Sequence, residues 1–219
     1  MVELKVKNIL VTGGAGFIGS HLQEKLLVLY PEANLICVDN FDSYYPRSVK
    51  EQNLVKAKQN KRFKLFEGDF TDNEWFVNVF KDIKVDLIVH LAAKAGVRPS
   101  ISNPVSYSKT NVEGLINVLE LAKRNNVLKL IYASSSSVYG KNENVPWQTT
   151  DLDLRPISPY AASKISGENF CKVYSELYNI PIVSLRFFTV YGPRQRPDLA
   201  IHKFFKRIDE GSAIDMFGD

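Results

Sequence analysis

Short apolar runs rich in β-branched residues alternate along the chain with longer stretches whose apolar positions recur every three to four residues. The short runs are typical of buried strands, and the periodic stretches are typical of helices that pack on one face. This alternation predicts an α/β fold with a doubly wound parallel sheet. The predicted strands are Ile9–Thr12, Leu35–Val38, Phe63–Phe66, Leu87–His90, Leu128–Ala133 and Pro181–Leu185. The predicted helices are Phe17–Leu29, Ser48–Gln59, Asn73–Phe80, Val105–Asn125, Pro159–Tyr178 and Leu199–Glu210.

The turn between the first predicted strand and the first predicted helix reads Thr-Gly-Gly-Ala-Gly-Phe-Ile-Gly over residues 12–19. Its glycines have the spacing of a dinucleotide-binding turn: one turns the chain, one lets amides approach a pyrophosphate, and one lets the helix approach the strand. The unpaired N–H groups at the start of the helix favour phosphate. The cofactor contacts predicted here are Gly13, Gly16, Phe17, Ile18 and Gly19.

The second predicted strand leads into Asp39, about twenty residues after the last glycine of the turn. A carboxylate at this place accepts hydrogen bonds from a ribose diol and repels a 2′-phosphate. We therefore expect NAD rather than NADP as the cofactor, with Asp39 and the adjacent Asn40 among its contacts.

Composition and charge exclude several classes of partner. The net charge of +4 comes from dispersed basic residues, and the sequence holds no nucleic-acid motif, so no nucleic-acid partner is expected. Cys37 and Cys171 lie in a predicted buried strand and a predicted helix, which makes a disulfide framework unexpected and a reducing cytoplasm the default compartment. The first residues lack a long apolar stretch, so neither a secretory signal nor a membrane span is predicted.

Two predicted helices, Val105–Asn125 and Pro159–Tyr178, carry apolar residues around much of their circumference. A single contact with the sheet would not cover both sides of such a helix. Two interpretations stay open: the helices pair with their copies in a homodimer, or they are buried within one subunit.

A candidate catalytic group lies at the carboxyl end of the predicted sheet. Tyr160 and Lys164 are four residues apart, so a helix stacks them on one face. This helix follows the predicted strand that runs out into Ser134–Ser137. Ligands of a doubly wound sheet bind at the carboxyl ends of its strands, where these hydroxyls emerge.

Together these segments resemble the extended short-chain dehydrogenase/reductase superfamily, in its nucleotide-sugar epimerase branch, which has a Rossmann-like fold. The resemblance covers nearly the whole chain. The residues that carry it are the glycine-rich turn at 12–19, Gly68-Asp69-Phe70, His90-Leu91-Ala92-Ala93, Asn111, Ser134–Gly140, Tyr160 with Lys164, and the run from Leu185 to Pro193.

The resemblance implies a catalytic triad of Ser135, Tyr160 and Lys164. Tyr160 would remove a proton from a sugar hydroxyl, because a lysine ammonium and a cationic nicotinamide both favour the phenolate over the phenol of pKa near 10. Lys164 would also hold the nicotinamide ribose, and Ser135 would bond the reacting oxygen. The further cofactor contacts implied are Asp69 and Phe70 at the adenine, Leu91, Ala92 and Ala93 along the trough, and Asn111 in support of the active-site loop.

The reaction implied is epimerisation at C4 of a UDP-sugar. The related 4,6-dehydratases carry an acidic pair after the catalytic hydroxyl, whereas this chain has Ser136 and Ser137, and a serine cannot be the general acid of an elimination. The segment Phe187–Ala200 looks like that of UDP-glucuronate 4-epimerases, which implies recognition of a sugar carboxylate by Ser136, Ser137, Thr189 and Arg196.

Two other functions stay open. Lys94 and the pair Arg194-Gln195 depart from the pattern of the glucuronate group, so UDP-glucose and UDP-galactose remain alternative substrates. A catalytically idle NAD-binding module is the second alternative.

The resemblance also predicts two domains: an NAD-binding Rossmann domain with the catalytic residues over 1–185, and the beginning of a substrate-binding lobe over 186–219. Relatives of this type continue beyond the turn at which the chain stops, so we expect the C-terminal part of the lobe to be lacking. Water would then enter the site and the nucleotide would have few anchors, which predicts NAD binding with low epimerase activity.

Overall fold

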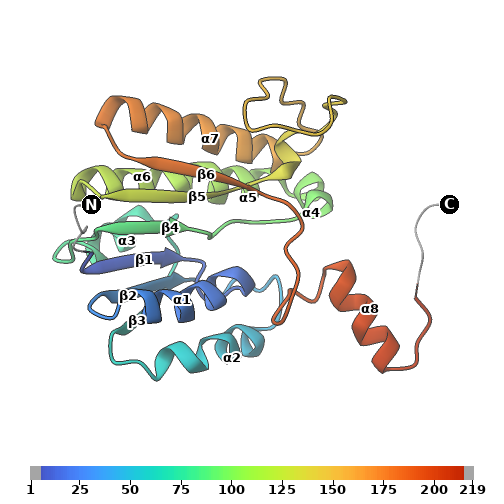
Figure 1. Cartoon of the computed structure of the whole chain (residues 1–219), viewed down its shortest axis with the longest axis horizontal. Coiled ribbons are helices and arrows are strands. Elements are labelled where there is room, and N and C mark those ends of the chain that lie inside the picture. Colours follow the sequence, from blue (N-terminus) through green and yellow to red (C-terminus); the bar gives the residue numbers. More distant parts are fainter. Residues whose placement is uncertain (1–5, 215–219) are drawn as a thin grey trace.

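Six parallel strands form one sheet in the computed structural model, which describes residues 6–214 (Figure 1). The spatial order β3-β2-β1-β4-β5-β6 confirms the predicted doubly wound, Rossmann-like fold, because the chain winds outward in both directions from β1 and β4. The strands are β1 (Asn8–Thr12), β2 (Asn34–Asp39), β3 (Phe63–Glu67), β4 (Leu87–His90), β5 (Lys129–Ser135) and β6 (Ile182–Phe187).

Helices connect the strands and cover both faces of the sheet. Along the described part of the chain they are α1 (Phe17–Leu29), α2 (Arg47–Lys58), α3 (Asn73–Val79), α4 (Val97–Ser102), α5 (Pro104–Ser108), the π-helical turn η1 (Lys109–Glu113), α6 (Gly114–Asn125), the 3₁₀ turn η2 (Ser136–Val138), α7 (Pro159–Tyr178) and α8 (Ala200–Asp209). No helix within residues 6–214 is long and apolar enough to cross a membrane.

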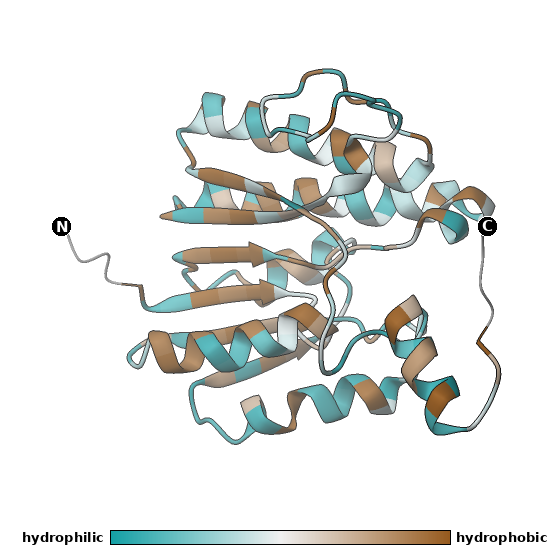
Figure 2. Ribbon diagram, turned by 45° about the vertical axis from the view of Figure 1, so that its right-hand side comes forward, coloured by the Kyte–Doolittle hydropathy of each residue, from teal (hydrophilic) through white to brown (hydrophobic). Residues whose placement is uncertain are grey.

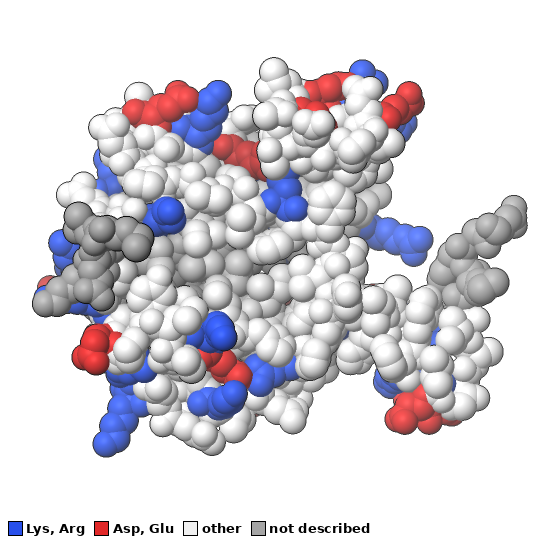
Figure 3. All heavy atoms as spheres, in the orientation of Figure 1, with Lys and Arg blue, Asp and Glu red and all other residues white. Residues whose placement is uncertain are grey.

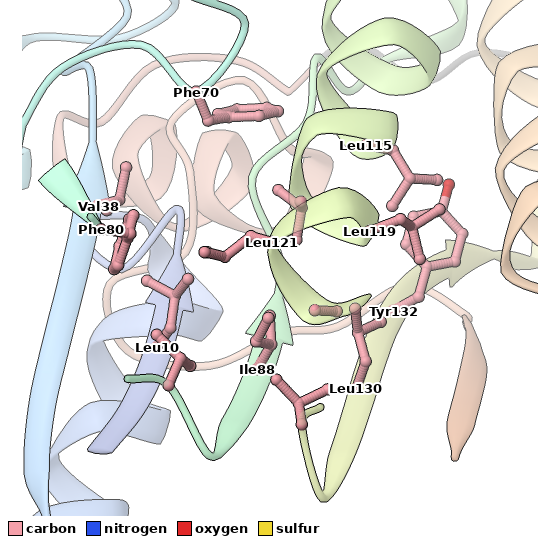
Figure 4. Packing of buried hydrophobic residues seen from close by; sticks show 14 of the residues in the cluster. Leu10, Val38, Phe70, Phe80, Ile88, Leu115, Leu119, Leu121, Leu130 and Tyr132 are labelled. Carbon is pink, nitrogen blue, oxygen red and sulfur yellow. The ribbon is translucent and has the colours of Figure 1, made fainter. Parts of the chain in front are cut away.

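The two sides of the sheet bury separate cores, because successive residues of a strand point to opposite faces. Ile9 and Val11 of β1 pack with Leu26 of α1, whereas Leu10 packs with Leu119 of α6. Figure 4 shows leucines of α6 above Ile88 and Leu130 of the sheet. The strands are therefore predominantly hydrophobic, while the helices carry both kinds of residue (Figure 2).

One predicted helix is wrong in its detail. The stretch Val105–Asn125 consists of α5, the turn η1 and α6 rather than one regular helix, and the short helix α4 before it was not predicted. The π-helical turn changes the direction in which later residues face, because each of its hydrogen bonds spans one residue more than in an α-helix. Within this turn Asn111 is buried and faces the loop that follows β4.

The central strands β1 and β4 are neighbours, but the chain runs from β1 to β2 on one side and from β4 to β5 on the other. These opposite connections open a crevice at the carboxyl ends of β1 and β4. Gly13 follows β1 with a left-handed backbone (φ 70°), and a Cβ on it would lie 2.7 Å from the backbone nitrogen of Ala92 after β4. Thr12 holds the other side of this contact, since its hydroxyl bonds both the Nδ1 of buried His90, at 2.7 Å, and the N–H of Ala92, at 3.3 Å. The turn after β1 and the loop after β4 are thus locked together by backbone proximity.

Candidate active site

A cavity of about 540 Å³ opens at the carboxyl edge of the sheet. The structure brings nearly all the residues predicted for cofactor, substrate and catalysis to its wall. They are Gly13, Gly16, Phe17, Ile18, Gly19, Asp39, Asn40, Asp69, Phe70, Leu91, Ala92, Ala93, Ser135, Ser136, Ser137, Tyr160, Lys164, Thr189 and Arg196. Basic and acidic side chains are interspersed on the face shown in Figure 3, which displays no broad field of one sign.

The glycine-rich turn fits the pyrophosphate of a dinucleotide. A Cβ on Gly19 would lie 2.4 Å from the carbonyl oxygen of Gly13, so only glycine permits this approach of helix to turn. Gly16 is the N-cap of α1 and carries no side chain that could bond the free N–H groups of the first turn. Uncapped amides at the positive end of a helix, on the wall of a cavity, suit an anionic phosphate. NAD therefore fits the residues that are present.

Asp39 holds the turn as well as lining the cavity. Its Oδ2 accepts the Ala15 N–H at 3.0 Å and its Oδ1 accepts the Phe41 N–H at 2.9 Å. Burial raises the pKa of this carboxyl group, and the Lys50 ammonium, whose Nζ is 3.8 Å from Oδ1, opposes the rise. Each carboxylate oxygen accepts one backbone hydrogen bond here and can accept a second. Asp39 can therefore hold the turn and still accept a hydrogen bond from a ribose hydroxyl.

Tyr160 and Ser135 meet at the start of α7. The hydroxyl of Ser158 caps this helix by accepting the Ala161 N–H, which fixes Tyr160 in the first turn. Burial raises the pKa of the Tyr160 phenol, while a hydrogen bond with Ser135 and the positive charge of Arg196 lower it. The phenol is therefore half-buried beside a hydroxyl that can share its proton.

Lys164 is a buried lysine. It is 3% exposed, and its Nζ donates to the carbonyl oxygen of Ala133 at 2.7 Å, above the ring of Tyr132. Burial lowers the pKa of this amine to about 8. In the structure the groups that lower the pKa of the Tyr160 phenol are Ser135 and Arg196, so the direct electrostatic role foreseen for Lys164 stays a prediction.

An ion pair that sequence reasoning missed lies next to Ser135, the serine predicted to be catalytic. Glu168 binds Arg186 of β6 at 2.8 Å and accepts a hydrogen bond from Ser134, which precedes Ser135. The guanidinium of Arg186 also lies over the ring of Tyr139. A signal was available, because Glu168 is one helical turn beyond Lys164 on the same face of α7, where an isolated acid would be costly to bury.

Asn111 lies beneath the cavity rather than on its wall. Its side chain bonds both the N–H and the carbonyl of Lys94, at 2.8 and 2.9 Å, and also the Ser163 hydroxyl. It therefore supports the loop after β4 from behind, and its contact with the cofactor stays a prediction. Further wall residues that sequence reasoning left out are Asp42, Tyr44, Tyr45, Lys50, Lys94 and Thr110.

A parallel sheet, a glycine-rich turn at its switch point and a Tyr-x-x-x-Lys helix beside a serine define the chain as an extended short-chain dehydrogenase/reductase. The sequence profile of the NAD dependent epimerase/dehydratase family matches residues 9–219. The chain belongs to this family, which confirms the resemblance predicted from the sequence; NAD is the family's cofactor.

Three similar proteins illustrate the relationship. UDP-glucuronate 4-epimerase 1 of Arabidopsis thaliana is 40% identical over 96% of this chain and 48% of its own. A crystal structure of the Bacillus cereus UDP-glucuronic acid 4-epimerase with UDP-glucuronic acid and NAD is 40% identical (TM-score 0.86), covering 97% of this chain and 66% of that one. The UDP-N-acetylglucosamine 4-epimerase of Methanobrevibacter ruminantium M1 is 34% identical (TM-score 0.87), covering 99% and 67%. The chain spans about two thirds or less of the length of the curated relatives it matches.

The two glycines of the turn should respond differently to a methyl group. Gly16→Ala adds a Cβ 3.2 Å from the Gly13 carbonyl oxygen, a tight contact that needs a small backbone shift, and places it on the wall where phosphate would approach. We expect a smaller loss of the free energy of unfolding than in Gly19→Ala, and an NAD affinity reduced about tenfold or more. Gly19→Ala should instead lower the free energy of unfolding by about 1–3 kcal/mol, because its Cβ meets backbone. Calorimetric NAD titration and urea unfolding check both; equal NAD affinity in Gly16→Ala and wild type would contradict the assignment.

The buried amine of Lys164 predicts a pH dependence of stability without added cofactor. The folded-state pKa of about 8 lies below the ordinary value of 10.5, so the cost of burying the charge is fully present below pH 8. Between these values the unfolded chain binds more protons, and stability rises with pH. Relative to Lys164→Met, the wild type should gain up to about 3 kcal/mol across this range in urea unfolding. If the free energies of unfolding of the two proteins changed in parallel with pH, the pKa of the Lys164 amine would not be lowered, and the prediction would be wrong.

Proposed function

We propose that the protein of this chain is an NAD-dependent UDP-sugar 4-epimerase. The observation that carries the proposal is the convergence of Ser135, Tyr160 and Lys164 with the glycine-rich turn on the wall of one cavity. A protein that only bound NAD would have no need of a half-buried phenol beside a serine hydroxyl. The similarity to 4-epimerases acting on UDP-glucuronate and on UDP-N-acetylglucosamine supports the same reaction class.

The side chains supply positioning and proton transfer. NAD, when bound, supplies a hydride acceptor and donor at C4 of the sugar, chemistry that no side chain here can provide. Tyr160 takes the proton of the C4 hydroxyl and returns it, while Ser135 holds the reacting oxygen by a hydrogen bond. Lys164 holds the ribose next to Tyr160. The oxidised sugar is a 4-keto compound, and reduction of its opposite face after rotation gives the C4 epimer.

UDP-glucuronate is the substrate that we favour. Ser136, Ser137, Thr189 and Arg196 all line the cavity and offer hydroxyls and a guanidinium to a sugar carboxylate. Ser136 and Ser137 also leave the positions after Ser135 without the acid that a dehydratase needs. One contact favours the second candidate, UDP-glucose with UDP-galactose. Arg196 already binds Asp198 at 3.1 Å, so its charge is partly neutralised before any substrate arrives.

We also propose a homodimer, formed through a smaller surface than the sequence suggested. The apolar residues of α6 are buried within the subunit, namely Leu115, Val118, Leu119 and Leu121. Val105 on α5 and Val173 and Leu177 on α7 remain exposed, and α5 packs against α7. Exposed apolar residues on neighbouring helices suit an isologous contact between two copies.

Replacing Tyr160 tests the mechanism. We expect Tyr160→Phe to keep NAD affinity within about twofold, because the lost hydroxyl serves the sugar, and to abolish C4 inversion. Inversion is followed by NMR on UDP-glucuronate, UDP-glucose and UDP-N-acetylglucosamine, with wild type as the reference. An unaltered rate in Tyr160→Phe would remove the mechanism. NAD binding without inversion of any of these sugars by the wild type would favour the idle NAD-binding module.

Light scattering at micromolar concentration tests the dimer. We expect the wild type to show twice the chain mass of 24.8 kDa. The double variant Val173→Asp, Leu177→Asp should give the single mass, because charges on an apolar contact are costly to desolvate. Exposed Leu152→Asp is the matched control and should leave the mass unchanged. A monomeric wild type would contradict the proposal.

A further inference from the structure

The segment that follows β6 crosses the mouth of the cavity, and we call residues 188–199 the strap. It leaves the edge of the sheet at β6, passes the carboxyl ends of the central strands and reaches the side of α1 and α2, where α8 begins (Figure 1). The strap forms one wall of the cavity, through Phe188, Thr189, Val190, Arg196 and Leu199. The turn before α1, with Gly13, Gly16 and Phe17, lines the cavity as well.

Two contacts fasten the strap to α1. The Nη2 of Arg194 is 2.7 Å from the Oε1 of Glu24, and the Nε2 of His21 lies 2.9 Å from the carbonyl oxygen of Pro193. The backbone supports this fastening, because Arg194 adopts a left-handed conformation (φ 65°) within the turn that begins at Gly192. Buried Gln195 closes that turn, with its N–H donated to Gly192 and its side chain to Val190.

The carboxylate of Glu24 is well placed to hold a cation. The side chain of Glu24 is only 15% exposed. Its Oε2 lies 3.0 Å from the Nζ of Lys56 of α2. Burial raises the pKa of this carboxyl group, but the neighbouring cations Lys56 and Arg194 outweigh that effect and leave the pKa lowered. Lys56 is 71% exposed whereas Arg194 is 28% exposed, so Arg194 is the better shielded partner. Ion pairs shielded from water are screened less than surface pairs.

A second pair of contacts holds the far end of the strap. The hydroxyl of Tyr44 donates to Asp198 at 3.2 Å, and the guanidinium of Arg196 lies over the Tyr44 ring. Arg196 and Tyr44 both line the cavity, so a ligand bound there could replace their mutual contact. Glu24 and Arg194 do not line the cavity. Their ion pair therefore contacts no ligand there and only holds the strap against α1.

We infer that the Glu24–Arg194 ion pair is a latch that governs how long NAD stays bound. The turn before α1 and the strap both line the cavity, so a dinucleotide held there would lie between them. Outward movement of the strap would widen its exit, and that movement breaks this pair. The inference rests on the NAD binding of the proposed function and not on epimerisation. The latch therefore affects the dissociation rate more than the association rate, since it resists opening and makes no contact with the ligand.

The test is the dissociation rate of NAD, measured by stopped-flow displacement with a fluorescent analogue. Glu24→Gln and Arg194→Gln should each release NAD about tenfold faster or more, with association changed less than about twofold. The double variant Glu24→Arg, Arg194→Glu should recover part of the loss, because the pair is restored with reversed charges. Lys56→Gln is the matched control: it removes the exposed partner of Glu24 and should leave release within about twofold.

Arg194→Gln changes a residue of the strap and leaves α1 intact. It therefore tests the latch even if Glu24→Gln lowers the stability of α1. Unchanged release in Arg194→Gln, at wild-type melting temperature, would overturn the latch. Release accelerated as much by Lys56→Gln would also overturn it, by showing a general effect of charge on α1. If the protein binds NAD but does not invert C4, the dissociation rates can still be measured and still test the latch. If the wild type does not bind NAD, both the latch and the cofactor proposal are wrong.

Discussion

The close approach of Gly13 to Ala92 is the constraint on which the site depends. No side chain fits between these backbones, because a Cβ on Gly13 would stand 2.7 Å from the Ala92 nitrogen. The contact joins the turn after β1 to the loop after β4 at the switch point of the sheet, where the carboxyl ends diverge. Much of the cavity wall lies on either side of this junction: the start of α1 on one side, and β5 with α7 on the other.

Burial then sets the chemistry of the groups that surround the cavity. It raises the pKa of the Tyr160 phenol and lowers that of the Lys164 amine, so in the free protein both groups are biased toward their neutral forms. Glu168 and Arg186 neutralise each other beneath Ser134 and do not impose a net charge. A positive charge brought next to the phenol therefore has a large effect in this poorly hydrated place. The proposed mechanism therefore requires the bound ligand to turn Tyr160 into a base.

The sequence predicted the strands, the main helices and many of the wall residues, because these follow from local periodicity, the glycine-rich turn and short motifs. It could not predict the turn η1, since a π-helical turn leaves no mark on hydrophobic spacing and the stretch looks like one helix. The short helix α4 was not predicted, because Pro99 has a low helix propensity and forms a helix with three neighbouring polar residues only in the folded context. The partners of Lys164 and Arg194 are Ala133 and Glu24, contacts between distant parts of the chain that only the tertiary structure determines.

The central claim is that Tyr160 ionises because of what is bound beside it. The most direct measurement is an NMR titration of ¹³Cζ-labelled tyrosine, assigned with Tyr160→Phe, without and with saturating NAD. Without NAD, the account predicts a pKa of Tyr160 above that of free tyrosine, as burial requires. With NAD⁺ bound, the pKa should fall below that of free tyrosine. The same pKa in both titrations would contradict the account.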